Sequence, residues 1–281
     1  MVKIIAVSGV KGGVGKSSVA ILLSLYLSKN YKVLLADLDV ECPNDYILLI
    51  QKLEKEIGKV FREHPVLIKE KCKKCGICAK SCNQNAIFWV KGKYPIFIKE
   101  NCIGCGLCQI KCPFGAIKMK KEEVGKVFLN KVNENLYLLT GVSKEEIEET
   151  GDIVKKSKEI ALEFCKKEKI DYLIIDTGVG MHCNVIHALI NSDLVLLVSE
   201  PTPLGAYDLD LALKLTKRLK LKTKVILNKA GIGDEKFIER IAKKNKVEIA
   251  LKIPFSIEFA KTYSQGKILE FKRINWMKVI E

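Results

Sequence analysis

The chain has 281 residues, 48% of them hydrophobic, and a formal net charge of +15. This size suits one large domain or two unequal ones with a packed core, and no apolar run reaches the roughly 18–20 residues of a membrane span. The first residues have no signal-peptide layout, so we expect a cytoplasmic protein without a membrane partner. Eleven cysteines in such a chain favour metal or redox chemistry over disulfides.

The positive charge comes from lysines that are scattered along the chain. Enrichment in lysine, glutamate and isoleucine is typical of thermophilic proteins. The surplus also suits an acidic partner. Lysines that are not gathered with aromatic residues argue against a nucleic-acid partner.

Strands and helices alternate in most of the sequence. A strand at Lys3–Ser8, a helix from Ser17 to about Lys29 and a strand at Lys32–Asp39 make a βαβ unit. The predicted fold class is α/β, with a doubly wound, mostly parallel sheet covered on both faces. The later elements are strands at Leu136–Thr140, Tyr172–Asp176, Leu194–Ser199 and Lys224–Asn228, and helices at Ile153–Lys169, Val185–Ile190, Leu204–Leu219 and Glu235–Asn245.

An internal repeat interrupts this alternation between residues 62 and 123. Residues 68–72 and 86–87 recur, 30 positions later, as 98–102 and 116–117. Each half is expected to begin on a short strand, bind metal and end in Ala-Ile, which resembles a duplicated bacterial-type ferredoxin. We therefore expect a ferredoxin-like α+β domain at 62–123, inserted into a discontinuous domain made of 1–61 and 124–281.

Eight cysteines form two runs with the spacing Cys-x-x-Cys-x-x-Cys-x-x-x-Cys. In the ferredoxins that the repeat resembles, the fourth cysteine of each run binds the other cluster. A pair of structural zinc sites is the alternative. The resemblance implies that cluster 1 is held by Cys72, Cys75, Cys78 and Cys112, and cluster 2 by Cys102, Cys105, Cys108 and Cys82.

A phosphate-binding loop follows the first predicted strand. The ordinary motif fits imperfectly, because Val10 stands where its first glycine belongs, but the variant Lys-Gly-Gly-x-Gly-Lys-Ser fits at residues 11–17. Backbone N–H groups of such a loop cradle phosphate, Lys16 meets the β- and γ-phosphates, and Ser17 coordinates Mg²⁺. The predicted nucleotide-binding residues here are Gly12, Gly13, Val14, Gly15, Lys16, Ser17 and Ser18.

This variant loop resembles the branch of P-loop ATPases that contains MinD, ParA, Mrp and the nitrogenase iron protein. The resemblance implies that Lys11 reaches the nucleotide of a second copy, so that ATP closes a homodimer. Lys11, Lys16 and Asp39 are then catalytic, and Asp39 positions or deprotonates the attacking water. Other matching positions are Asp37 and Asp176, which would support Mg²⁺ with Ser17, Gly180 near the γ-phosphate, Asn228 and Lys229 near adenine, and the loop Glu200–Pro203 on the nucleotide side.

Cys183 lies seven residues after Asp176 and next to His182. The nitrogenase iron protein places a cluster cysteine at a similar offset, so two Cys183 thiols facing each other across a dimer could bind a transferable metal or cluster. The alternative is a small residue that starts a helix. The basic amphipathic stretch 271–280 is expected to form a packed helix rather than a membrane-binding tail of the kind MinD proteins use.

The whole chain resembles MinD-superfamily ATPases that contain an inserted ferredoxin domain. The resemblance implies ATP, Mg²⁺ and two [4Fe–4S] clusters as cofactors, and a redox or apo-metalloprotein partner. We expect an ATP-hydrolysing protein that acts in metallocluster assembly or transfer through a nucleotide-gated dimer. The alternative is ATP-gated electron transfer to a partner enzyme, as in the nitrogenase iron protein. A positioning ATPase, like ParA or MinD, needs no clusters.

Overall fold

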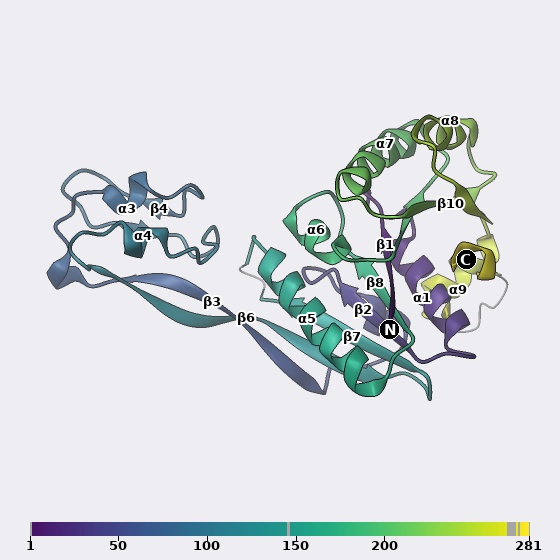
Figure 1. Ribbon diagram of the computed structural model, residues 1–281, viewed down its shortest axis with the longest axis horizontal. Coiled ribbons are helices and arrows are strands. Elements are labelled where there is room, and N and C mark those ends of the chain that lie inside the picture. The colour runs from purple at the N-terminus through teal and green to yellow at the C-terminus, as the bar shows by residue number, and fades with distance from the viewer. Residues whose placement is uncertain (1, 145–146, 269–273, 275, 281) are drawn as a thin grey trace.

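The computed structural model describes residues 2–144, 147–268, 274 and 276–280. Its centre is a nine-stranded sheet in the order β11-β10-β9-β1-β8-β2-β7-β6-β3 (Figure 1). The strands from β11 to β7 are parallel, whereas β6 and β3 are antiparallel to their neighbours. The parallel strands are β1 (Lys3–Ser8), β2 (Val33–Leu38), β7 (Leu136–Ser143), β8 (Tyr172–Thr177), β9 (Leu194–Ser199), β10 (Thr223–Ala230) and β11 (Ile249–Pro254).

Helices cover both faces of the parallel part of the sheet, and each face has its own apolar core. Burial on both faces explains why β2 and β9 are apolar along almost their whole length rather than alternating. The predicted doubly wound, mostly parallel α/β fold is confirmed. One face carries α5 (Gly151–Glu168), α6 (Cys183–Leu189), α7 (Pro203–Arg218) and α8 (Lys236–Asn245), and the other carries α1 (Lys16–Leu27), α9 (Ile257–Ser264) and α10 (Met277–Ile280).

Two elements near the C-terminal end, β11 and α9, were not predicted. β11 lies at the edge of the sheet and its residues are only partly buried, so its sequence lacks the long apolar run of the central strands. Helix α1 begins one residue earlier than predicted, at Lys16. Gly15 before it has a φ of 97°, a left-handed conformation that glycine adopts without strain.

The last two strands of the sheet form a ribbon that extends beyond the others (Figure 1). β3 (Glu56–Leu67) and β6 (Ile117–Lys131) pair continuously, from Glu56 opposite Phe128 to Leu67 opposite Ile117. Residues 68–116, which we call the cysteine module, lie at the far end of this ribbon. The domain limits expected from the sequence, 61/62 and 123/124, therefore fall inside two strands that also belong to the main sheet.

The sequence repeat is also a repeat of backbone structure within the cysteine module. The short helices α3 (Ile77–Lys80) and α4 (Leu107–Ile110) are 30 residues apart. β4 (Ile87–Phe88) pairs with β5 (Ile96–Phe97) just as the start of β6 pairs with the end of β3. Each half therefore follows a strand, as predicted, and ends on a strand that pairs with the other half.

Candidate functional site

A cavity of about 410 Å³ opens over the phosphate loop at the carboxyl ends of the parallel strands. Loop residues turn backbone toward it and α1 starts beneath it, an arrangement that suits a phosphate group. Of the predicted nucleotide-binding residues, those that line the cavity are Gly12, Gly13, Gly15, Lys16, Ser17, Ser18, Asn228 and Lys229, together with Asp39. Val14 instead points its side chain into the core, where it is 2% exposed.

Asn228 and Lys229 at the end of β10 are bonded directly to the phosphate loop. The Asn228 side-chain amide donates to the carbonyl oxygen of Val14 at 2.8 Å, and Lys229 Nζ donates to that of Gly13 at 2.9 Å. A Cβ at Gly15 would lie 2.3 Å from Asn228 Nδ2. These two side chains therefore hold the loop, and Gly15 is required at its position.

Lys11 forms an ion pair within its own chain. Its Nζ donates to Glu200 Oε1 at 2.8 Å, and the other carboxylate oxygen of Glu200 accepts from Lys229 at 2.9 Å. The hydrogen bond and charge of Glu200 raise the pKa of Lys11, so the lysine stays charged. Glu200 belongs to a loop that the sequence singled out, but its pairing with two lysines was not predicted.

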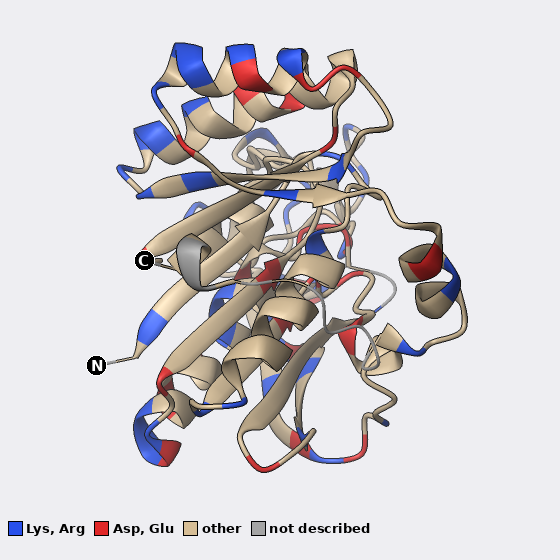
Figure 2. Ribbon diagram, turned by 90° about the vertical axis from the view of Figure 1, so that its right-hand side faces the viewer, with Lys and Arg blue, Asp and Glu red and all other residues tan. Residues whose placement is uncertain are grey.

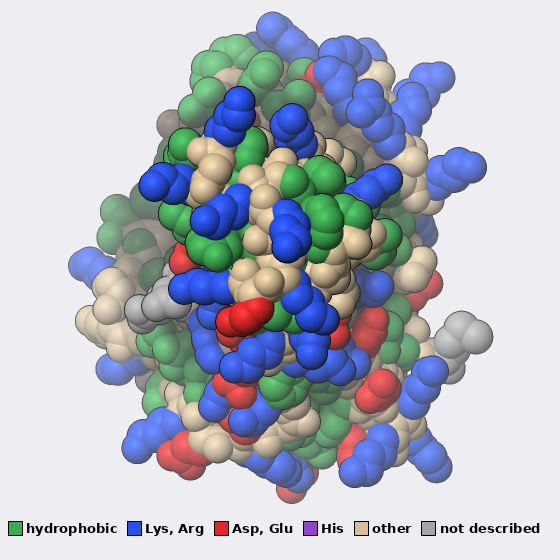
Figure 3. Space-filling view, turned by 90° about the vertical axis from the view of Figure 1, so that its left-hand side faces the viewer, with side chains coloured by type: hydrophobic (Ala, Val, Ile, Leu, Met, Phe, Trp, Pro, Cys, Tyr) green, Lys and Arg blue, Asp and Glu red, His purple; other side chains and the backbone are tan. Residues whose placement is uncertain are grey.

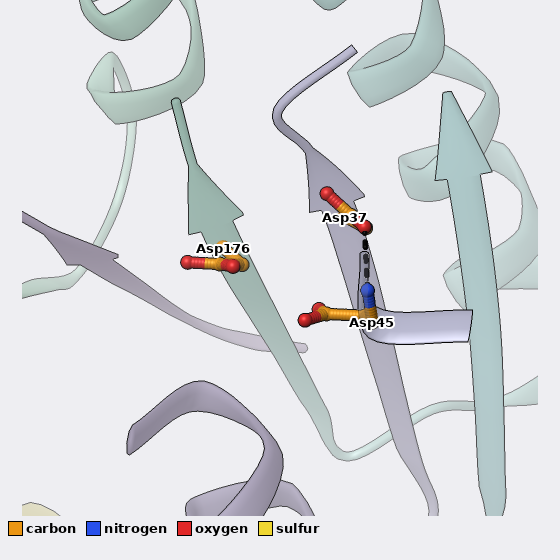
Figure 4. Close-up of side chains that lie close together, drawn as sticks. All are labelled: Asp37, Asp45 and Asp176. Atoms are coloured by element: carbon orange, nitrogen blue, oxygen red, sulfur yellow. Dashed lines mark hydrogen bonds between the residues drawn. The ribbon is translucent and has the colours of Figure 1, made fainter. Parts of the chain in front are cut away.

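Three buried carboxylates converge behind the phosphate loop (Figure 4). Asp37 lies on β2, Asp176 on the neighbouring strand β8, and Asp45 at the start of α2 (Asp45–Leu48). Their oxygen atoms lie within 4.8 Å of one another. The sequence predicted the first two and missed Asp45, for which a third acidic residue in the loop after β2 was the available signal.

The carboxylate pKa values reflect this crowding. Burial raises the pKa of Asp176 to about 7, although Ser17 and Lys16 pull it down. Burial and the charge of neighbouring carboxylates raise the pKa of Asp37 and of Asp45 well above the ordinary value. Buried carboxylates that repel one another suit a divalent cation, because its charge offsets their repulsion. Ser17, whose side chain is hydrogen-bonded to Asp176, can act as a further ligand.

Asp37 and Asp39 take different positions. The Asp37 carboxylate accepts backbone N–H bonds from Asp39, Asn44 and Asp45, so it holds the loop of residues 39–45 in place. Asp39 itself faces the cavity, with Gly178 of the loop after β8 beside its carboxylate. Gly180, which the sequence placed near the γ-phosphate, donates its N–H to the carbonyl oxygen of Val10.

The apolar wall on the far side of the cavity was also not predicted from the sequence. It is formed by the end of β11 and by α9, the two elements that were not predicted, and suits the flat face of a base. Ser256 caps α9 by accepting the N–H of Phe259 at 3.0 Å, which fixes where the wall turns. Its members are Ile253, Pro254, Phe255, Phe259, Ala260 and Tyr263.

Two further cavities lie in the cysteine module. Each is lined by the first three cysteines of one run and the last cysteine of the other. This grouping is the one that the ferredoxin resemblance implied. Cys72, Cys75, Cys78 and Cys112 line the first cavity, and Cys102, Cys105, Cys108 and Cys82 line the second.

Backbone N–H groups point at the sulfur atoms of these cavities. Lys74 donates to Cys72 Sγ at 3.4 Å, and Ala116 donates to Cys112 Sγ at 3.3 Å. Burial raises the pKa of the Cys108 thiol to about 11. Thiolates in such a place need both N–H donors and a metal cation to be stable, so the donor set fits metal binding.

Cys183 is exposed at the start of α6. A Cβ added at Gly151 would lie 3.4 Å from Cys183 Cβ and 3.2 Å from His187 Cδ2, so both side chains face the start of α5. Within the described residues, Cys183 and His187 do not join a third acidic, histidine or cysteine side chain in a group compact enough for one metal ion.

Much of the C-terminal stretch 271–280, predicted to be a packed helix, lies outside the described residues. The part that is described includes α10, and Trp276, Val279 and Ile280 are buried against α1 and the sheet. None of the described helices is long and apolar enough to cross a membrane. Lysines and arginines lie on many elements, among them the helices at the top of Figure 2, where α7 and α8 lie in Figure 1.

Two proteins of Methanocaldococcus jannaschii resemble the chain over most of its length. The uncharacterized protein MJ0579 is 35% identical over 265 residues, which are 94% of this chain and 90% of that protein. The uncharacterized protein MJ0578 is 30% identical over 234 residues, 83% of this chain and 80% of the other.

Solved structures share the fold at lower identity. The cell division ATPase MinD of Pyrococcus furiosus has a TM-score of 0.59 and 18% identity, covering 98% of this chain and 93% of its own. A plasmid partition protein of Borrelia burgdorferi bound to AMPPNP has a TM-score of 0.56 and 22% identity, covering 95% and 90%. The family described as the CobQ/CobB/MinD/ParA nucleotide binding domain matches residues 5–269. With the phosphate-loop cavity and this match together, the chain belongs to the CobQ/CobB/MinD/ParA nucleotide-binding family.

Proposed function

We propose that the protein is an ATPase whose nucleotide state controls electron transfer through two [4Fe–4S] clusters. One observation carries this proposal: two complete sets of four cysteines, each around its own cavity, share a chain with a phosphate-loop cavity. When bound, each cluster supplies a one-electron redox centre, and the chain provides its ligands, its N–H donors and its shielding from water.

The spacing of the cysteines favours clusters over zinc. Four thiolates on one zinc ion stand roughly 3.8 Å apart, because each Zn–S bond is about 2.3 Å long. Among the described residues, the three aspartates near the phosphate loop form the one group of ligands within 4.8 Å of each other, and the eight thiols form none. Thiols this far apart suit the corners of a larger inorganic core.

The apolar packing of one cysteine in each set favours permanent centres over transferable cargo, although Cys75 and Cys105 are exposed. Cys78 and Cys108 share a small apolar core with Ile87 and Ile117, one residue of each kind from each half of the repeat. A site that releases its metal is expected to be open and to lack a full ligand set. This supports the electron-transfer alternative over cluster assembly or transfer, which the sequence alone ranked first.

The nucleotide half supplies the residues for hydrolysis. Lys16 neutralises the β- and γ-phosphates, while Ser17 and Asp176 would hold Mg²⁺. Asp39 faces the cavity and orients a water toward the γ-phosphorus. The new P–O bond forms as the bond from the γ-phosphorus to the bridging oxygen breaks, and the proton that the water loses passes to Asp39 and then to the product phosphate, which leaves ADP and phosphate.

In the proposed homodimer, Lys11 contacts the nucleotide bound to the second copy. To reach a second copy's nucleotide, Lys11 must leave Glu200, which then remains paired with Lys229. The Lys11 side chain is 39% exposed, so it can leave without unpacking the core. Nucleotide binding and dimer formation would thus compete with the Lys11–Glu200 pair.

The far end of the cysteine module suits a protein partner. Residues 68–116 contain nine lysines and two glutamates, so the formal charge of the module is +7. Figure 3 shows lysines lying among apolar side chains on this end of the molecule. Phe88, Ile96 and Ile110 are more than half exposed there. An acidic redox protein would complement this surface.

Anaerobic purification followed by EPR tests the proposal. We expect about eight iron atoms per chain and a signal after reduction with dithionite. Each electron taken from dithionite should then pass to an oxidised acceptor protein in the presence of MgATP, with the iron remaining on the chain. Lys16→Ala should keep the iron and lose the effect of ATP.

Two outcomes contradict this function. Zinc in place of iron would remove the redox centres. Loss of the reduced signal at equal rates with and without MgATP would show that the nucleotide does not control the transfer.

Cluster assembly or transfer remains the second candidate because Cys183 is exposed beside the loop that follows Asp176. In that case iron and sulfide themselves would move to an apo-acceptor in the presence of MgATP. Cys183→Ser should slow this movement, and unchanged delivery by the variant would remove Cys183 from the mechanism.

A further inference from the structure

Arg62 on β3 connects three separate parts of the chain. Its guanidinium binds both carboxylate oxygens of Asp152, in the first turn of α5, and donates to the backbone carbonyl of Glu149. It also donates, at 3.1 Å, to the carbonyl of Cys102, a residue of the second cysteine cavity. The Arg62 side chain is only 3% exposed, whereas that of Asp152 is 40% exposed, so the guanidinium is buried and its carboxylate partner reaches the solvent.

The second half of the cysteine module rests directly on this part of β3. Gly104 has a φ of 71°, and a Cβ there would lie 2.8 Å from the carbonyl oxygen of Glu63 and 3.0 Å from Arg62 Cγ. The equivalent residue in the first half is Lys74, which has a similar φ of 55° and carries a full side chain. The repeat is therefore broken at the place where the second half touches β3.

Within the described residues, the first half has no comparable hydrogen bond to the domain beyond the ribbon. In the part of the chain that the structure describes, residues 72–95 form hydrogen bonds only with one another and with other residues of the module. Both cysteine cavities are lined by residues of β3 and β6, but it is Cys102 of the second set whose carbonyl is bonded to Arg62.

The segment bound by Arg62 is also bound to the loop of residues 39–45 after β2, which we call the nucleotide loop because Asp39 lines the nucleotide cavity. Thr150 Oγ1 donates to Glu41 Oε1 at 2.7 Å, and Asn184 of α6 donates to the same oxygen at 3.4 Å. Glu41 follows Asp39, which lines the nucleotide cavity, by two residues. Residues 149–152 therefore touch the loop after β2 on one side and Arg62 on the other.

We propose that Arg62 and Thr150 are positioning residues that couple the nucleotide loop to the second cysteine cavity and not to the first. This rests on the proposed function and specifies which metal site responds to the nucleotide. Movement of Glu41 on nucleotide binding displaces Thr150. Residues 149–152 form a short segment that leads into α5, which begins at Gly151. A displacement of Thr150 therefore passes to Asp152, and from there to Arg62 and the Cys102 carbonyl.

Hydrogen–deuterium exchange on the full chain, purified anaerobically, tests this coupling. With MgAMPPNP, wild-type residues 99–108, which carry three cysteines of the second cavity, should change their exchange rate about threefold or more, a change of roughly 0.7 kcal/mol in local opening. Residues 69–78, which carry three cysteines of the first cavity, should change little. Thr150→Val and Arg62→Lys should abolish the change. Both variants should bind a fluorescent ATP analogue as wild type does.

Lys59→Ala is the matched control. Lys59 lies on the same strand and pairs with Glu123 across the ribbon and with Glu56, so the described ion pairs of its side chain involve neither residues 149–152 nor a cysteine. This variant should keep the nucleotide response. If Arg62 only stabilised the structure, the Arg62→Lys variant would show faster exchange than wild type by the same factor with and without nucleotide.

Three results would overturn the coupling: an equal response of both halves, no response in a wild-type protein that binds the nucleotide, or a response that persists in Thr150→Val and Arg62→Lys. Iron content and electron transfer are measured separately. Failure of the proposed function is therefore distinguishable from failure of this coupling, which is read from exchange alone.

Discussion

Asp45 places a third carboxylate beside Asp37 and Asp176, and neither of its oxygens has a hydrogen-bond partner among the described residues. A buried charged group without partners is costly, and three together are more so. The site therefore stores unfavourable energy that a divalent cation relieves. Affinity for the metal is gained at the expense of stability in its absence.

The stability of the Mg²⁺-free, nucleotide-free protein should depend on pH through this site. Since the pKa of Asp176 is raised to about 7, the folded state holds protons that the unfolded chain has lost above the ordinary value of 3.8. The stability from these carboxylates is fully present at low pH and is lost as pH rises toward 7. Thermal unfolding of the wild type should accordingly occur at a lower temperature at pH 8 than at pH 6.

Asp45→Asn removes one of the charges at nearly the same volume. Burial and the charges of Asp37 and Asp176 raise the pKa of Asp45, so the wild type must hold a proton or an unfavourable charge there that the variant does not. Each unit by which a folded-state pKa exceeds its ordinary value corresponds to about 1.4 kcal/mol. In Mg²⁺-free buffer at pH 8 the variant should unfold at a higher temperature than wild type, with a flatter dependence on pH. An identical pH dependence in the two proteins would mean that Asp45 does not act on this site.

At the scale of elements, the ribbon of β3 and β6 makes the cysteine module an extension of the main sheet. The loop from Cys102 to Gly106 lies on β3, and Gly104 fits there because it has no side chain. Gly92 also has a positive φ, of 79°, but a Cβ there meets no atom within 4 Å. The two glycines share the backbone requirement and differ in the contact.

Gly104→Ala and Gly92→Ala separate these effects. Both should cost about 1–2 kcal/mol for an alanine in a left-handed conformation. Gly104→Ala should cost more, because its Cβ also pushes against backbone of β3, and should release iron to a chelator faster. Chelation kinetics and thermal unfolding measure both quantities; equal losses in the two variants would contradict the close contact.

At the scale of the whole molecule, two distant cysteines exchange places between the halves of the repeat. Cys112 lines the cavity of the first run and Cys82 that of the second. Each cavity then needs both halves of the module, which ties the folding of one half to that of the other. One run by itself would give its cavity only three thiols, because the fourth comes from the other run.

Paired substitutions test this exchange through iron content. If the chain holds the two proposed clusters, Cys72→Ser with Cys112→Ser should remove one of them and leave about half of the iron, because both residues line the same cavity. Cys102→Ser with Cys112→Ser should remove nearly all of it, because one ligand is lost from each cavity. The reverse pattern would show that each run holds its own cluster.

The sequence by itself determined what depends on neighbouring residues. The glycines and Lys16 of the phosphate loop follow one strand and begin one helix, so their spacing alone predicted the cavity that they line. The alternation of apolar strands and helices predicted the parallel sheet for the same reason. The 30-residue repeat predicted two equivalent cysteine sets, and both sets line cavities.

Only the tertiary structure decided the contacts between segments that are far apart in the chain. Arg62 meets Asp152 across 90 positions, and Lys11 meets Glu200 across 189. Charged side chains of this kind are common on surfaces, so nothing local marks them as partners. Such pairs form because the fold brings their elements together: Lys11 and Glu200 follow the neighbouring strands β1 and β9, and Asp152 lies on the helix α5, which packs against β3.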